Sequence, residues 1–417
     1  MKFHLRIFLL RAAPALLLTA ACVHAHAEEE LEHLYPDSNL TLGSVLQATF
    51  ERDPRQPLLQ ANMVGVEARD KHASALLPGA PAVDLNHQTD AIGSGRNLRE
   101  WGATLEFPVW LPGQKSAREA VAREARGGLD ASRTGLLLDA AGRLREAYWD
   151  VSMNRNAAEL AGRRAQTALA LEQDVERRQQ AGELAKTDVM LAKNETLQAQ
   201  AAQLRAEAEL KHAEHRWWML TGLKSIPVYG DEQQASEAQA DDSHPLLAPS
   251  ARRVALMQEE RNLARVERRE NPQVLLSARH DRGAFDDAFD NSVGLAVRIP
   301  LDAEVRSAPL MARAEMDLAQ AMTEHEQRRL DLLAVMHEAE HNLEVTRQEL
   351  VLVEEQNRLA QENLNLARKA FTLGETDLVA LLRVQALAFE AERALQTRRI
   401  QLQWDIARYN QAAGVLP

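Results

Sequence analysis

The strongest constraint on the fold is an internal duplication, because the same landmarks occur twice in the 417-residue chain. The stretch "WGATLEFPVW" at 101–110 aligns with "VGLAVRIPLD" at 293–302, with matching glycine and proline positions. The offset is 192 residues, and at that same offset, without a gap, Gly182 falls on Gly374. Several independent landmarks at one spacing indicate two copies of a single structural unit.

The two units are predicted to cover residues 28–223 and 250–417. Between them, residues 224–249 form an acidic stretch with three prolines and no hydrophobic periodicity. Such a composition is typical of a linker.

Each unit contains two short segments in which apolar and polar residues alternate. They lie at about 82–91 and 100–109 in the first unit, and at about 273–282 and 291–301 in the second. Alternation with period two predicts strands that have one apolar and one polar face. A hairpin packed on an ordinary core is the alternative interpretation.

Long helices are predicted after each pair of strands. Residues 114–180 are helical in pattern throughout, which at 1.5 Å per residue corresponds to roughly 100 Å. In the second unit, apolar residues recur in steps of three and four, as in a coiled-coil seam: Met336, Ala339, Leu343, Leu350, Val353, Ala360, Leu364, Ala367 and Phe371. Glycine-containing tips at about 181–188 and 373–380 then permit a sharp reversal into a returning helix.

The N-terminus has the features of an export signal. A basic start is followed by a short apolar run, and "AHA" at 25–27 offers a cleavage site after Ala27. Cys22, the only cysteine, leaves acylation as an alternative, and the mature chain has no disulfide either way. No later run of apolar residues is long enough for a transmembrane helix, so any membrane span must be β.

Four strands in one chain cannot close a membrane barrel, since the smallest barrels need about eight, whereas three chains would supply about twelve. Trp101 and Trp110 bracket the second strand, as interfacial aromatic residues bracket a lipid-facing band. Two ordinary buried tryptophans are the alternative. The formal charge of −12 argues against nucleic acid as a partner.

With these features together, the chain resembles the TolC family of outer-membrane efflux channels. The resemblance is carried by the duplicated layout, the "FP" and "IP" strand ends at 107–108 and 299–300, and the tips "QQAGELAKTDVMLAK" and "FTLGETDLVALLRVQ". It extends over essentially all of the mature chain, and "LTLGSVLQATFERDP" at 40–54 resembles the family's N-terminal helix.

The resemblance implies a mainly α fold with membrane β structure: a homotrimer forms a twelve-stranded outer-membrane barrel, continued by a coiled-coil helical barrel through the periplasm. It implies no catalysis and no cofactor. The tips would contact a periplasmic adaptor and, through it, an inner-membrane pump. The tip residues are Gly182, Glu183, Leu184, Asp188, Gly374, Glu375, Thr376 and Asp377.

Four of these tip residues are acidic, and threefold repetition would turn each into a ring of charge suited to a cation-tolerant pore. The alternative is that acids beside a helix start merely favour the helix dipole. As for substrate, "FPVWLPGQKSAREAVAREA" at 107–125 is similar to metal-exporter branches, which favours heavy-metal cations. Drug efflux and type I protein secretion remain alternatives.

One motif points to a different class of protein. "VMHEAEHNL" at 335–343 contains the H-E-x-x-H pattern of zinc proteases, with His337 and His341 as ligands and Glu338 as general base. However, a charged glutamate occupies an x position, and both histidines fall off the seam of the duplicated helix. We therefore interpret this stretch as one exposed helical turn with at most a weak metal contact. A structural periplasmic coiled coil, the third class, does not explain the strands.

Overall fold

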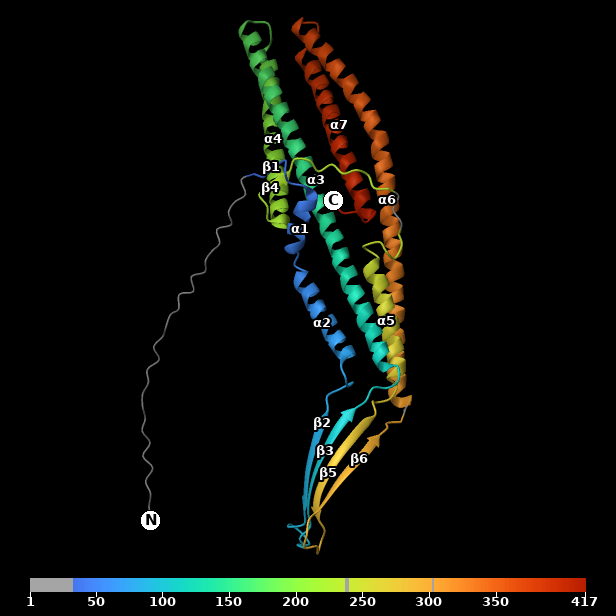
Figure 1. Cartoon of the computed structure of the whole chain (residues 1–417). Helices are drawn as coiled ribbons and strands as arrows, with labels where there is room; N and C mark the ends of the chain where they lie inside the picture. The colour runs from blue at the N-terminus through green and yellow to red at the C-terminus, as the bar shows by residue number, and fades with distance from the viewer. Residues whose placement is uncertain (1–32, 237–239, 302–303) are drawn as a thin grey trace, which may run out of the picture.

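The computed structural model describes residues 33–236, 240–301 and 304–417, so the predicted signal peptide at 1–27 and Cys22 lie outside the described residues. The molecule is elongated, with a four-stranded sheet at one end and the tips of two helical hairpins at the other (Figure 1). A group of short elements surrounds the middle of the long helices.

The long helices come in two pairs, and each pair follows two strands of the sheet: α3 (Gln114–Gln180), α4 (Lys186–Thr221), α6 (Glu304–Thr372) and α7 (Leu378–Ala412). Helices α3 and α6 have 67 and 69 residues, so each runs roughly 100 Å at 1.5 Å per residue. Strand pair, long helix, tight tip and returning helix therefore occur twice. The predicted duplicated architecture is confirmed.

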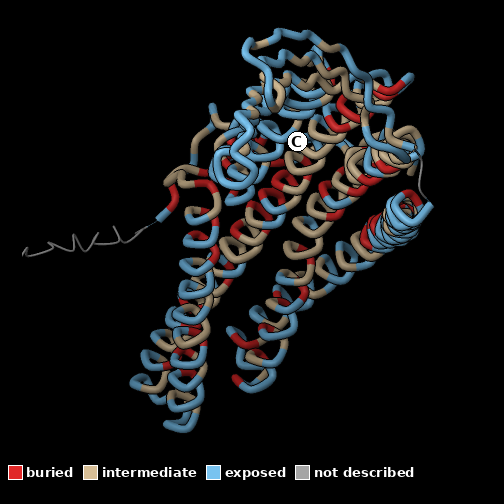
Figure 2. Tube along the Cα trace, turned by 90° about the horizontal axis from the view of Figure 1, so that it is seen from below, coloured by how far each residue is buried: buried red, intermediate tan, exposed pale blue. Residues whose placement is uncertain are grey.

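The helices pack through narrow stripes rather than around one central core, and Figure 2 shows buried residues recurring along each helix. On α6 the predicted seam is confirmed, because Ala339, Leu343, Leu364 and Phe371 are buried and its other members are half-buried. Thr346, a polar member of the stripe, is buried and donates to Asp405 Oδ2 at 2.7 Å on α7. In the described ranges, no helix combines the length and apolarity needed to cross a membrane.

The sheet has the order β2-β3-β5-β6, with every neighbouring pair antiparallel. Its strands are β2 (Ala82–Thr89), β3 (Arg99–Pro108), β5 (Gln273–Arg282) and β6 (Asp290–Arg298). Strand β3 of the first unit pairs with β5 of the second, with Leu105 opposite Leu276. The two units therefore share one sheet, and β2 and β6 form its edges.

Three shorter helices flank the long ones: α1 (Leu42–Glu51), α2 (Gln56–Ser74) and α5 (Ala248–Val266). Helix α1 begins at a capping box between Thr41 and Ser44 and packs its buried Val45 into the main core cluster on α3 and α4. That cluster also contains Trp217, whose indole nitrogen donates to the Ser225 carbonyl at 3.0 Å.

The corner between α1 and α2 is held to α3 by a buried carboxylate. Asp53 accepts from Arg55 Nε at 3.0 Å and also from Arg143 of α3. These hydrogen bonds hold the pKa of Asp53 well below its ordinary value, and the bond from Arg55 has the largest effect. The charged form is thus the stable one, and the charged contacts add to the apolar packing that holds the corner to α3.

The stretch predicted as a linker, 224–249, contains regular structure that its sequence pattern does not predict. Strand β4 (Ser225–Pro227) pairs in parallel with β1 (Tyr35–Asp37), and α5 begins at Ala248 within the stretch. Glu232 forms a bidentate pair with the buried Arg145 of α3, at 2.8 and 2.6 Å. The segment is therefore packed against the middle of the helices.

Candidate functional site

The two hairpin tips have the same backbone geometry. Gly182 and Gly374 both adopt positive φ, at 83° and 76°. In the residue after each glycine, the backbone N–H donates 2.9 Å to a carbonyl five residues earlier, Arg178 for Glu183 and Ala370 for Glu375. Glycine has no Cβ to clash in this left-handed conformation, which explains why the duplication preserves it at both tips.

Three of the four acidic tip residues serve the local structure. Asp188 Oδ2 accepts from the Ala185 N–H at 3.0 Å, and Asp377 Oδ1 accepts from the Ala380 N–H at 2.8 Å. Both carboxylates therefore cap the start of the returning helices. Glu183 pairs with Arg178 at 3.1 Å. These contacts agree with the helix-dipole alternative, and the predicted acidic rings stay a prediction.

The two hairpins touch each other just inside their tips. The Arg178 guanidinium lies 4.8 Å from the centre of the Phe371 ring and donates to the Phe371 carbonyl at 3.4 Å. An apolar cluster beneath this contact joins both hairpins through buried Val175 and Leu378, with Leu184 packed against it. Thr376 is half-buried, whereas Glu375 is exposed at the outer surface of its tip. The adaptor-contacting role of the tip residues stays a prediction.

The sheet has two chemically different faces, because the register brings like residues opposite each other across all four strands. One face is apolar: Val83, Leu85, Ala103, Leu105, Phe107, Val274, Leu276, Ala278, Val293, Leu295 and Val297. The other is mostly polar and includes Asp84, Asn86, Glu100, Thr104, Glu106, Ser277, Arg279 and Asp281. The apolar face is uncovered in the single chain, and Val293 is 79% exposed.

Trp101 and Trp110 lie at opposite ends of β3 in different surroundings. Trp101 is 56% exposed on the apolar face and stacks on His87 of the neighbouring strand, with ring centres 3.9 Å apart. Trp110 lies just beyond the strand, where its indole nitrogen donates to the Leu76 carbonyl at 3.0 Å. It is half-buried beside Arg118. A membrane-interface role for both tryptophans stays a prediction.

The histidine pair lies where the coiled-coil interpretation predicted. His337 and His341 are exposed on α6, with ring centres 6.5 Å apart, while Ala339 between them is buried in the seam. Within the described ranges, no group of three or more His, Cys, Asp or Glu residues is arranged to hold a metal ion. The third ligand that a catalytic zinc site requires is thus not found there.

Solved structures share this geometry. The outer-membrane protein VceC from Vibrio cholerae superposes with a TM-score of 0.72 at 16% identity, covering 91% of this chain and 99% of that one. For the Campylobacter jejuni CmeC outer-membrane channel the TM-score is 0.66 at 12% identity, over 89% and 85% of the two chains. The Neisseria gonorrhoeae MtrE outer-membrane channel, solved in its open state, gives 0.67 at 15%, over 90% and 89%.

At such low identities these likenesses establish the fold, and they extend over nearly the whole of each chain. The sequence itself matches no protein-family profile and no curated protein. The chain thus has the fold of outer-membrane channels, as the resemblance to the TolC family implied. Of these three structures, CmeC and MtrE are described as outer-membrane channels and VceC as an outer-membrane protein.

Proposed function

We propose that the chain is the outer-membrane channel subunit of a tripartite efflux system and conducts substrate passively to the outside. The sheet carries this proposal, because it has an uncovered apolar face and two unpaired edge strands, β2 and β6. Unpaired edges are a template for pairing with another chain, and in lipid every backbone polar group needs an internal partner. Three copies joined edge to edge supply about twelve strands, enough to close a barrel.

The two faces of the sheet fit the two environments of such a barrel. Outer-membrane barrels alternate apolar residues toward lipid with polar residues toward the lumen. Leu105 and Leu276 would then contact outer-membrane lipid, while Thr104 and Arg279 would line the lumen. The long helices would extend into the periplasm.

The tips are the expected contact with partner proteins. They lie farthest from the sheet (Figure 1), and Leu373 and Glu375 are exposed there. A periplasmic adaptor would bind this surface and connect the channel to an inner-membrane pump. Energy would come from the pump, so the chain itself needs no catalytic group or cofactor.

The substrate is a separate question. Heavy-metal cations stay a prediction from the sequence, with drug efflux and type I protein secretion as the alternatives. Growth of a deletion strain in graded copper, zinc and drug concentrations separates them. Sensitivity to metals alone supports metal export, sensitivity to drugs alone supports drug efflux, and loss of a secreted protein from the medium supports secretion.

Membrane fractionation and gel mobility test the proposed class directly. The chain is expected in the outer membrane, as a detergent-resistant complex that becomes a single chain only on boiling. A soluble periplasmic monomer would contradict the proposal, and zinc-dependent proteolysis by that monomer would favour the protease interpretation instead.

A further inference from the structure

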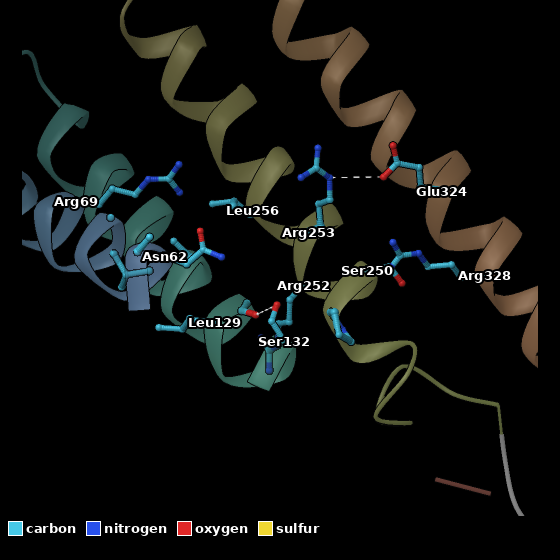
Figure 3. A pocket seen from close by; sticks show the side chains of 16 residues that line it. Asn62, Arg69, Leu129, Ser132, Ser250, Arg252, Arg253, Leu256, Glu324 and Arg328 are labelled. Carbon is cyan, nitrogen blue, oxygen red and sulfur yellow. Dashed lines mark hydrogen bonds and ion pairs between the residues drawn. The ribbon is translucent and has the colours of Figure 1, made fainter. Parts of the chain in front are cut away.

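Four neighbouring helices line an open cavity on the concave side of the layer they form. Helix α2 packs on α3, α3 on α5, and α5 on α6. A cavity of about 440 Å³ is lined by residues from all four helices (Figure 3). In a curved layer, the side chains of the first and last helices converge on the concave side and diverge on the convex side. Residues of both helices can therefore line one cavity only on the concave side.

A different side of α3 is turned toward the short elements. Ala125 and Ser132 of α3 line the cavity, whereas Leu144 and Tyr148 pack into the core cluster around α1. At about 100° per residue, these two directions differ by about a third of a turn. In a barrel closed by three such layers, the concave side is the inner one. The cavity would therefore open onto the conduction path.

The lining has a net positive charge. Among its described residues are four arginines, Arg69, Arg252, Arg253 and Arg328, and one acid, Glu324. Three of the arginines have only loose carboxylate partners: Arg252 with Glu124 at 3.4 Å, Arg69 with Glu260 at 3.6 Å and Arg253 with Glu324 at 3.7 Å. Tight charge-assisted bonds are about 2.7–2.9 Å long, so most donors of these guanidinium groups stay available.

Arg328 is the most available of the four. It is exposed on α6, and the described part of the chain contains no hydrogen bond or ion pair to it. Figure 3 shows its side chain pointing inward from α6 while Arg69 points inward from α2 on the other side. The adjacent Arg329 differs, because it is paired with Glu326 at 2.6 Å along the same helix. Arg329 is thus a natural control for Arg328.

We propose that this cavity binds the oxyanion group, a carboxylate or a phosphate, of a small organic molecule. The planar fork of arginine matches both groups in two-point contact. Leu129, Leu256 and Pro249 supply apolar wall for the rest of the ligand. The arginines repel divalent metal cations, so the site favours an anionic substrate over a heavy metal. The location of the site on the conduction path rests on the proposed function, whereas the cavity itself is formed within one chain.

Calorimetry on the detergent-solubilised full mature chain tests the site, with inorganic pyrophosphate and citrate as probes and zinc chloride as a third titrant. At least one of the two anions is expected to bind. Tighter binding of pyrophosphate indicates a phosphate ligand, and tighter binding of citrate indicates a carboxylate ligand. Arg328→Gln and Arg253→Gln are each expected to weaken that binding about tenfold or more, because each removes charged hydrogen bonds. Arg329→Gln is expected to leave it unchanged, with equal melting temperatures confirming the fold.

The outcomes separate this inference from the proposed function. No binding of either anion, or binding that Arg328→Gln and Arg253→Gln leave intact, would overturn the site, even if the protein is a trimeric channel. If the arginines repel cations, zinc binds more tightly to Arg328→Gln than to the unmodified chain. Zinc binding that requires Arg328 would overturn the proposed anion site. Anion binding by a protein that is a monomer outside the membrane would support the site and contradict the channel.

Discussion

The two faces of β3 can be tested at adjacent positions. Leu105 lies on the apolar face between Val83 and Leu276, and Thr104 lies on the polar face opposite Asp84 and Ser277. Arginine at either position has the same charge and volume and lies at nearly the same depth. Only the face of the sheet differs, so the pair isolates the environment of each face.

The expected cost can be estimated from the position of Leu105 near the centre of β3. An arginine facing lipid at the bilayer midplane destabilises a barrel by about 2–4 kcal/mol, and 1.4 kcal/mol corresponds to about tenfold in an equilibrium constant. Leu105→Arg should therefore shift the folding equilibrium by about thirtyfold to several hundredfold. Thr104→Arg should cost much less, because water and the carboxylate of Asp84 can solvate the new charge.

The assay is the yield of boiling-sensitive complex in the outer membrane, together with urea unfolding of the protein reconstituted in lipid vesicles. Leu105→Arg is expected to lower the midpoint of unfolding and the yield of complex, and Thr104→Arg to leave both near the unmodified values. Equal losses in the two variants, or a larger loss for Thr104→Arg, would refute the assignment of the faces.

Three further predictions concern stability. Arg145→Ala removes the bidentate partner of Glu232, whose mostly buried carboxylate then keeps only the Asn410 amide as a donor, and should cost about 3 kcal/mol in urea unfolding. The pKa of Asp53 is lowered in the folded chain, so its carboxylate stabilises the folded state at pH values above its ordinary pKa. This contribution to the free energy of unfolding is lost as the pH falls below the ordinary pKa. Melting temperatures of Asp53→Asn should therefore fall less than those of the unmodified chain as the pH is lowered from about 5 to 3. Gly374→Ala, at positive φ, should destabilise the chain by about 1 kcal/mol, whereas Gly65→Ala, with open space around it inside α2, should stabilise it by about 0.4–1 kcal/mol.

Periodicity over long stretches was the most informative part of the sequence. The helix expected over 114–180 matches α3 at both ends, because no proline interrupts the pattern and the turn at Gly182 ends it. The same periodicity separated the histidines of "HEAEH" from the seam, and His337 and His341 are exposed in the structure. The helical pattern therefore placed the local motif on an exposed helix face, and the structure has both histidines there.

Contacts between distant short segments could not be predicted in the same way. Strands β1 and β4 have three residues each and pair across almost the whole first unit, so no alternation marks them. The bidentate pair between Arg145 and Glu232 joins residues 87 positions apart. The arginine-lined cavity likewise gathers side chains from α2, α3, α5 and α6 that show no common spacing in the sequence.

The proposed trimeric barrel is tested by the number of chains in the membrane complex. Native mass spectrometry of the complex released from purified outer membranes measures it without assuming any contact. A mass of three mature chains is expected, because joining the unpaired edges of β2 and β6 in three copies would supply enough strands to close a barrel. A mass of one chain, or absence of the protein from the outer membrane, would contradict the proposed barrel.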